Sequence, residues 1–114
     1  MHLLATTSGV IDGAAEAVDL GQSPADLVVL SAADSELAAL ARAHDHAPCP
    51  MRLANLMALQ HPLSVDLYIE KTLRHARLIV LRILGGASYW SYGLDEVEAL
   101  ARQHGILLCV LPGD

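Results

Sequence analysis

Three of the four aromatic residues in this 114-residue chain lie within four positions of one segment. Tyr89, Trp90 and Tyr92 follow the pair Gly85-Gly86 at the end of an apolar run. Aromatic rings supply a large contact area at little conformational cost, so they could stack on a macrocycle or anchor a protein partner. The same rings could instead cover the end of a sheet, and the sequence leaves both interpretations open. We take Gly85, Gly86, Tyr89, Trp90 and Tyr92 as candidate ligand or interface residues.

Arg82 interrupts the apolar run 78–84 and is a further candidate. A charge inside such a run must emerge at an edge or find a partner. An ion pair, or a hydrogen bond to a carbonyl group, is the favoured interpretation, and a role in binding an anionic ligand is the alternative. Asn55, inside the apolar run 53–59, receives the same interpretation.

A hydroxyl-rich turn follows the first apolar run, with the residues Thr6, Thr7, Ser8 and Gly9. If this turn enters a helix, its backbone N–H groups and the helix dipole could hold an anion. Ordinary turn and cap chemistry explains the same residues, and the glycine-rich phosphate-binding signatures are absent. Thr6, Thr7 and Ser8 are therefore candidates for an anion-binding turn.

The segment 44–49 brings together imidazole, carboxylate and thiol groups, with His44, His46 and Cys49 as its potential metal ligands. These are suitable ligand types for a divalent transition metal. Their spacing matches no established pattern, so we expect no physiological metal site and at most adventitious binding. Cys49 and Cys109 are expected to be free thiols. No grouping of Ser, Cys, His and acidic residues indicates a nucleophile, and we assign no catalytic residue.

The composition excludes several classes of protein. Thirteen acidic and seven basic residues give a net charge of −6, which argues against nucleic-acid binding. The apolar runs are far shorter than the ~20 residues that span a bilayer, and the start of the chain lacks the pattern of a secretory signal. We therefore expect a cytoplasmic protein that crosses no membrane. Charged residues make up 18% of the chain, below the roughly 25% of average globular proteins. This low content indicates that part of the surface binds a partner.

Short apolar runs alternate with amphipathic helical patterns along the chain, and the elements that they predict must position these candidates. Runs without polar alternation predict strands buried on both faces, and the alternation predicts an α/β class with a parallel sheet. We expect a single domain over residues 1–114, with a flavodoxin-like three-layer sandwich and a five-stranded sheet of order 2-1-3-4-5. The predicted strands are 2–7, 27–31, 53–59, 78–84 and 106–111.

Four crossover helices are expected between these strands. Asp34 is the predicted N-cap of the second helix and Ser64 that of the third. Gly105 is expected to end the fourth helix, behind Arg102 and His104 in its last turn. The first crossover is interrupted by glycine and proline, and we expect about two helical turns in it, around residues 14–20.

Most of the chain resembles a known family. The segments that carry the resemblance are 18–26, 53–56, 61–77, 82–86, 89–93 and 111–114. Together they closely resemble the N-terminal region of the large subunit of aerobic cobaltochelatase, the CobN family, and they are also similar to the large subunit of magnesium chelatase. Two departures are visible, since Ser91 stands where the family pattern has proline and the segment 44–50 is peculiar to this chain.

The resemblance implies a part of an ATP-dependent ligase that inserts cobalt into hydrogenobyrinic acid a,c-diamide during aerobic cobalamin synthesis. It implies as partners the remainder of the large subunit, two AAA+-type subunits and the corrinoid precursor. Cobalt, ATP and magnesium are implied for the whole complex, and no cofactor is expected in this chain. Because the family's subunit is much longer, we expect this chain to be an N-terminal docking or lid domain without chelatase activity of its own.

The alternative is a stand-alone flavodoxin-like domain that binds a small anionic ligand or a nucleotide cofactor. Such a domain would need a fuller phosphate-binding loop after its first strand, and the turn at Thr6 to Gly9 meets half of that requirement.

Overall fold

The structure is a computed structural model that describes residues 4–5, 16–46, 48–85 and 87–113. The strands are β1 (Leu4–Ala5), β2 (Leu27–Ser31), β3 (Met51–Asn55), β4 (Leu78–Leu84) and β5 (Leu107–Gly113). The α-helices are α1 (Asp34–Arg42), α2 (Pro62–Lys71) and α3 (Ser91–His104). Short 3₁₀ turns lie at His44–His46, Leu56–Leu59, Leu73–His75 and Ala87–Trp90. No described helix combines the length and the apolar character needed to span a membrane.

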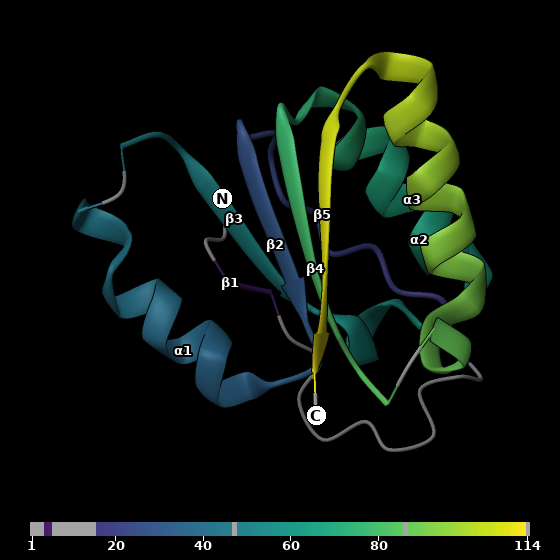
Figure 1. The fold of residues 1–114 in the computed structure, drawn as a ribbon, viewed down its shortest axis with the longest axis horizontal. Helices are drawn as coiled ribbons and strands as arrows, with labels where there is room; N and C mark the ends of the chain where they lie inside the picture. Colours follow the sequence, from purple (N-terminus) through teal and green to yellow (C-terminus); the bar gives the residue numbers. More distant parts are fainter. Residues whose placement is uncertain (1–3, 6–15, 47, 86, 114) are drawn as a thin grey trace.

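The strands form one parallel sheet of order β1-β3-β2-β4-β5, which confirms the α/β class (Figure 1). Four of them are five to seven residues long, whereas β1 is a two-residue strand paired with the edge of β3, so five full strands are not present in the described chain. The expected order 2-1-3-4-5 is wrong. β2 lies between β3 and β4, and β1 lies outside β3.

The helices lie on both faces of the sheet, with α1 on one face and α2 and α3 on the other (Figure 1). This distribution follows from the strand order. The connection from β2 to β3 runs across the sheet in the opposite direction to those from β3 to β4 and from β4 to β5. Since right-handed crossovers that run in opposite directions place their helices on opposite faces, α1 is separated from the other two helices.

Burial alternates strictly along β4 and shows which side chains face which layer. Ile79, Leu81 and Ile83 are buried in the larger core cluster, beneath α2 and α3. The intervening side chains of β4 are only partly buried and face the α1 side. There the smaller cluster joins Leu37 of α1 to Met51 and Leu53 of β3. The sheet is therefore well covered on one face and incompletely covered on the other.

The described segment before β2 contains no helix. Residues 17–20 lie outside any helix, so the helix expected around residues 14–20 is wrong for the described part, and residues 14–15 lie outside the described chain. Buried Gln22 fixes this segment, because its Nε2 donates to the Leu53 carbonyl at 2.8 Å while its Oε1 accepts from the Tyr68 hydroxyl at 2.5 Å. The Thr72 hydroxyl donates to the carbonyl of Gln22 at 2.7 Å. Burial raises the pKa of Tyr68, which remains a neutral donor.

β3 ends earlier than expected, at Asn55, and the predicted strand 53–59 is wrong beyond that residue. The Asn55 side chain accepts from the Met57 N–H at 2.7 Å and so caps the 3₁₀ turn Leu56–Leu59. Its amide donates to Asp34 Oδ1 at 2.6 Å, which fixes the end of β3 to the start of α1. As expected, this buried polar residue is satisfied by hydrogen bonds rather than exposed for ligand binding.

Two predicted helix caps are also wrong. Helix α1 begins at Asp34, and its N-cap is Ala33, without a side-chain cap. The N-cap of α2 is His61, whose Nδ1 accepts from the Leu63 N–H, whereas Ser64 is buried and its hydroxyl accepts from the Val18 N–H at 2.7 Å. The end of α3 is confirmed, because Gly105 takes the left-handed conformation (φ 66°) that ends the helix.

Candidate functional site

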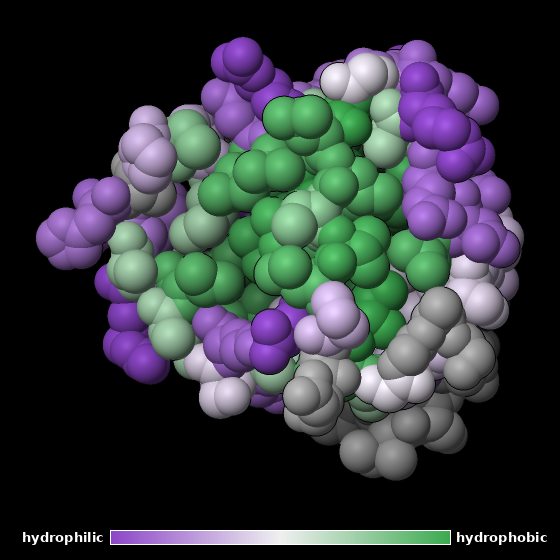
Figure 2. All heavy atoms as spheres, in the orientation of Figure 1, coloured by the Kyte–Doolittle hydropathy of each residue, from purple (hydrophilic) through white to green (hydrophobic). Residues whose placement is uncertain are grey.

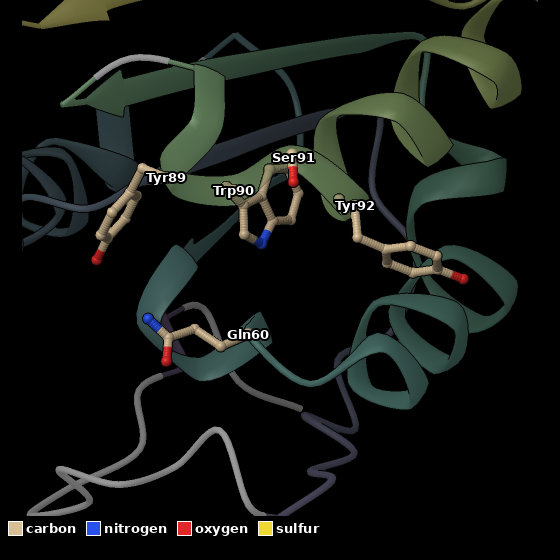
Figure 3. A pocket seen from close by; sticks show the side chains of 6 residues that line it. Gln60, Tyr89, Trp90, Ser91 and Tyr92 are labelled. Atoms are coloured by element: carbon tan, nitrogen blue, oxygen red, sulfur yellow. The ribbon is translucent and has the colours of Figure 1, made fainter.

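The carboxyl ends of β3 and β4 lie at one edge of the sheet, where parallel α/β proteins bind their ligands. The 3₁₀ turn Leu56–Leu59 follows β3 there, and the turn Ala87–Trp90 leads from β4 into α3. Between them lies a pocket of about 180 Å³ (Figure 3). Its lining residues are Gln60, Tyr89, Trp90, Ser91, Tyr92 and Gly93. The aromatic loop therefore lies at this edge of the sheet, which we call the rim.

Trp90 is part of the core and not a free ring for stacking. It is 4% exposed, and its Nε1 donates to the Leu59 carbonyl at 2.9 Å, linking the two turns. Gly93, one helical turn later, lies directly against the indole, since a Cβ at that position would stand 2.1 Å from Trp90 Cε2. Trp90 thus covers the end of the sheet, which is the second of the two interpretations that the sequence left open for this loop.

Tyr89 and Tyr92 remain accessible, with 40% and 41% of their surface exposed. Their rings point away from each other on either side of Trp90 (Figure 3). The Tyr92 hydroxyl donates to Asp66 Oδ1 of α2 at 2.8 Å, and this hydrogen bond to a carboxylate raises the pKa of Tyr92 to about 12. The Tyr89 hydroxyl contacts the sulfur of Met57. We call these two exposed rings the rim tyrosines.

The remaining loop and turn candidates are only partly described. Gly85 ends β4 with a φ of 87°, a conformation that favours glycine, and it is exposed. Gly86 lies outside the described residues, as do Thr6, Thr7 and Ser8 of the predicted anion-binding turn. That turn therefore stays a prediction.

Arg82 forms the ion pair that was the favoured interpretation. Its Nη2 lies 3.1 Å from Glu36 Oε2 of α1, and Glu36 Oε1 accepts from the Ser31 hydroxyl at 2.8 Å. Both charged side chains are a little over a third exposed, so the pair is worth less than about 1 kcal/mol. Arg82 lies on the α1 side of the sheet, whereas the rim tyrosines belong to the connection between β4 and α3.

The segment 44–49 does not assemble a ligand set in the described structure. His44 Nδ1 lies 3.7 Å from Asp45, whose side chain is 95% exposed. Across the described residues, no three His, Cys, Asp or Glu side chains come together in a way that could hold a metal ion. Cys49 and Cys109 are both free, as expected.

Three pocket residues, Gln60, Ser91 and Gly93, were not among the candidates taken from the sequence. Gln60 follows the run 53–59, and the early end of β3 at Asn55 brings it to the rim. Gly93 follows Trp90 by three positions, a spacing that brings two residues together at the start of a helix. A glycine at this distance from a large ring could have indicated from the sequence that the helix backbone packs closely against the indole. The pocket is smaller than the 300–1,000 Å³ typical of ligand sites, so this rim is better suited to contact with another surface than to enclosing a macrocycle or a nucleotide.

Comparison with known proteins identifies two curated relatives. The chain is 53% identical over 116 residues to the aerobic cobaltochelatase subunit CobN of Sinorhizobium sp, and 49% identical over 120 residues to the protein of the same name in Pseudomonas aeruginosa. Both alignments include the whole chain but only 9% of the relative, so the chain spans less than a tenth of their length. No family model matches the chain. No solved structure matches it either.

Proposed function

Because the chain is a homologue of the CobN subunit of aerobic cobaltochelatase, we propose that it is the N-terminal docking or lid domain of that enzyme's large subunit. In this proposal the complete complex is cytoplasmic and uses ATP to insert cobalt into hydrogenobyrinic acid a,c-diamide. The partners are the remainder of the large subunit and two AAA+-type subunits, and the corrinoid precursor is the substrate. The observation that carries the proposal is an identity of about half of all positions across the entire chain.

A role in docking is favoured over a role in the chemistry of metal insertion. Insertion requires a positioned macrocycle, a desolvated cation and groups that accept the pyrrole protons. The described residues offer no metal-ligand cluster, and the rim pocket of about 180 Å³ is too small for a tetrapyrrole. In this proposal we therefore assign none of these steps to this chain.

The rim tyrosines are the proposed contact residues. Tyr89 and Tyr92 are held by Met57 and Asp66, so their rings are oriented before any partner arrives. Pre-oriented tyrosines lose little conformational entropy on binding, which makes them effective anchors. Gly85 positions the start of this loop, and Arg82 holds the neighbouring end of β4 through Glu36.

The test uses the Sinorhizobium CobN subunit with its matching region replaced by this chain, a protein that we call the graft. Replacing Tyr89 and Tyr92 together with alanine should lower the rate of cobalt insertion by the assembled graft about tenfold, because two interface anchors are lost. Gln103→Ala, an exposed change in the last turn of α3, is the matched control and should leave the rate unchanged.

The thermal midpoint of each graft separates a docking defect from a folding defect, because both rim tyrosines are exposed and should contribute little to stability. An unchanged insertion rate in the double variant would contradict the assignment of the rim tyrosines. Tight binding of FMN by the 114-residue chain alone would instead favour the stand-alone binding domain.

A further inference from the structure

The sheet has an apolar face that no described helix covers. The half-buried Leu78, Val80 and Leu84 of β4 lie on the α1 side, and the register sets Leu107, Cys109 and Leu111 of β5 beside β4. We call these six apolar residues the open face. Arg82 lies between Val80 and Leu84 on the same side, and its charge is paired with Glu36 of α1. Figure 2 shows apolar residues gathered where Figure 1 places β2, β4 and β5. Leu107 is 71% exposed and Leu111 41%.

The open face lacks the helix that covers β4 and β5 on the opposite side of the sheet. On this side of the sheet the described core cluster joins α1 to β2 and β3, and it includes no residue of β4 or β5. On the opposite side, β4 packs with Val97, Leu100 and Ala101 of α3. Parallel sheets are normally covered by helices on both faces. One face of β4 and β5 therefore follows that rule and the other does not.

The dimensions of the open face suit one helix. Two strands are about 10 Å wide and seven residues of strand are about 23 Å long. A helix is about 10 Å in diameter and rises 1.5 Å per residue. The 14 residues of α3, about 21 Å of helix, already match the same two strands on the other side. A helix of about this length would cover the open face.

The area of the open face indicates what kind of partner could cover it. The open face is roughly 230 Å² in plan, well below the ~800 Å² per partner of a stable complex between separate molecules. A contact of this size holds when both parts belong to one polypeptide, because the effective concentration is then high. The curated relatives contain more than ten times as many residues as the region matched here.

We propose that the open face binds an amphipathic helix with an aliphatic face, supplied by another part of the same large subunit. The inference rests on the proposed function, since it takes the chain to be one domain of that subunit. It assigns a second contact surface, separate from the rim tyrosines. A second copy of the chain is the competing occupant, and the small area disfavours it.

The native Cys109 thiol reports whether the open face is covered. It is exposed, free and adjacent to Val80 in the sheet register. In the isolated chain, N-ethylmaleimide should modify Cys109 rapidly and at a rate that does not depend on chain concentration. In the graft, peptide mass spectrometry should show Cys109 modified at least about tenfold more slowly, because the helix must first open. Cys49, on the loop before β3, should react within about twofold in both proteins.

A pair of aspartate variants gives the matched control. Leu107→Asp places a charge in the open face and should restore rapid modification of Cys109 in the graft. Ala39→Asp places the same charge on an exposed position of α1 and should leave Cys109 protected. Equal Cys109 rates in the graft and the isolated chain would overturn the inference. So would protection in the isolated chain that grows with concentration and accompanies a doubled mass, because the occupant would then be a second copy.

The outcome is independent of the test of the proposed function. If Cys109 reacts rapidly in a graft that inserts cobalt, the open face is uncovered and the docking proposal stands. Cys109 could also be protected in a graft whose insertion rate is unchanged when both rim tyrosines are replaced with alanine. The helix is then present, and the assignment of those tyrosines fails.

Discussion

Replacement of Trp90 with alanine is expected to lower the free energy of unfolding by about 3–5 kcal/mol. The indole is 4% exposed, and its loss would leave both a cavity and an unpaired Leu59 carbonyl. Against a total stability of roughly 5–15 kcal/mol for a domain of this kind, the change removes a large fraction. Urea denaturation followed by far-UV circular dichroism measures it.

Tyr89→Ala is the control for this change, because Tyr89 is the adjacent aromatic residue and is 40% exposed. It should cost less than about 1 kcal/mol. If Trp90→Ala were no more costly than Tyr89→Ala, the indole would not be the core residue described here. Because Trp90 stabilises the fold, its variants cannot serve to test docking, and the rim tyrosines must be used instead.

Gly93→Ala is expected to lower the free energy of unfolding by about 1–3 kcal/mol, although alanine favours helix more than glycine does. Helix propensity alone predicts a gain of about 1 kcal/mol inside α3. The new methyl group would lie 2.1 Å from Trp90 Cε2, so the ring or the helix must move, and this overlap outweighs the propensity gain.

A double-mutant cycle isolates the cause of this effect. In a chain that already carries Trp90→Ala, the methyl group of Gly93→Ala meets no indole, and the substitution should be neutral or stabilising. The difference between the two backgrounds should be at least about 1 kcal/mol. An equal cost in both backgrounds would show that the contact between Gly93 and Trp90 is not responsible.

The sequence predicted the elements that follow from local chemistry. β2 and β4 have the expected bounds, because each is a mainly apolar run that begins directly after a charged residue, Asp26 or Arg77. Gly105 ends α3 because the left-handed conformation favours glycine. Arg82 found an acidic partner, because an unpaired charge beside a buried sheet is costly.

The errors arose where long-range contacts override local pattern. The apolar run 53–59 has the pattern of one strand, yet β3 ends at Asn55. The Asn55 side chain accepts from the nearby Met57 N–H and donates to Asp34, a residue that is distant in the sequence. Serine is a common N-cap residue, but the Ser64 hydroxyl accepts a hydrogen bond from the Val18 N–H instead of capping the helix. The strand order was wrong because right-handed crossovers permit either arrangement, and the pairing of β2 with both β3 and β4 decides between them.

The role of the aromatic loop as a site stays a prediction, and only the placement of its rings can be compared with the structure. The clustering of aromatic residues indicated one loop, and the structure places this loop at the carboxyl end of β4. The sequence could not show that Trp90 points inward and Tyr89 and Tyr92 outward, because that division depends on Gly93 and the Leu59 carbonyl. The open face was indicated only by the low content of charged residues.

The most direct test of the docking role compares the Sinorhizobium CobN subunit lacking its matching region with the graft that carries this chain there. Each is combined with the same AAA+-type subunits, cobalt, ATP and the corrinoid precursor, and the initial rate of cobalt insertion is measured. We predict that the deletion is at least about tenfold slower than the graft and that the isolated chain inserts no cobalt. A deletion as fast as the graft, or insertion by the isolated chain, would contradict the account.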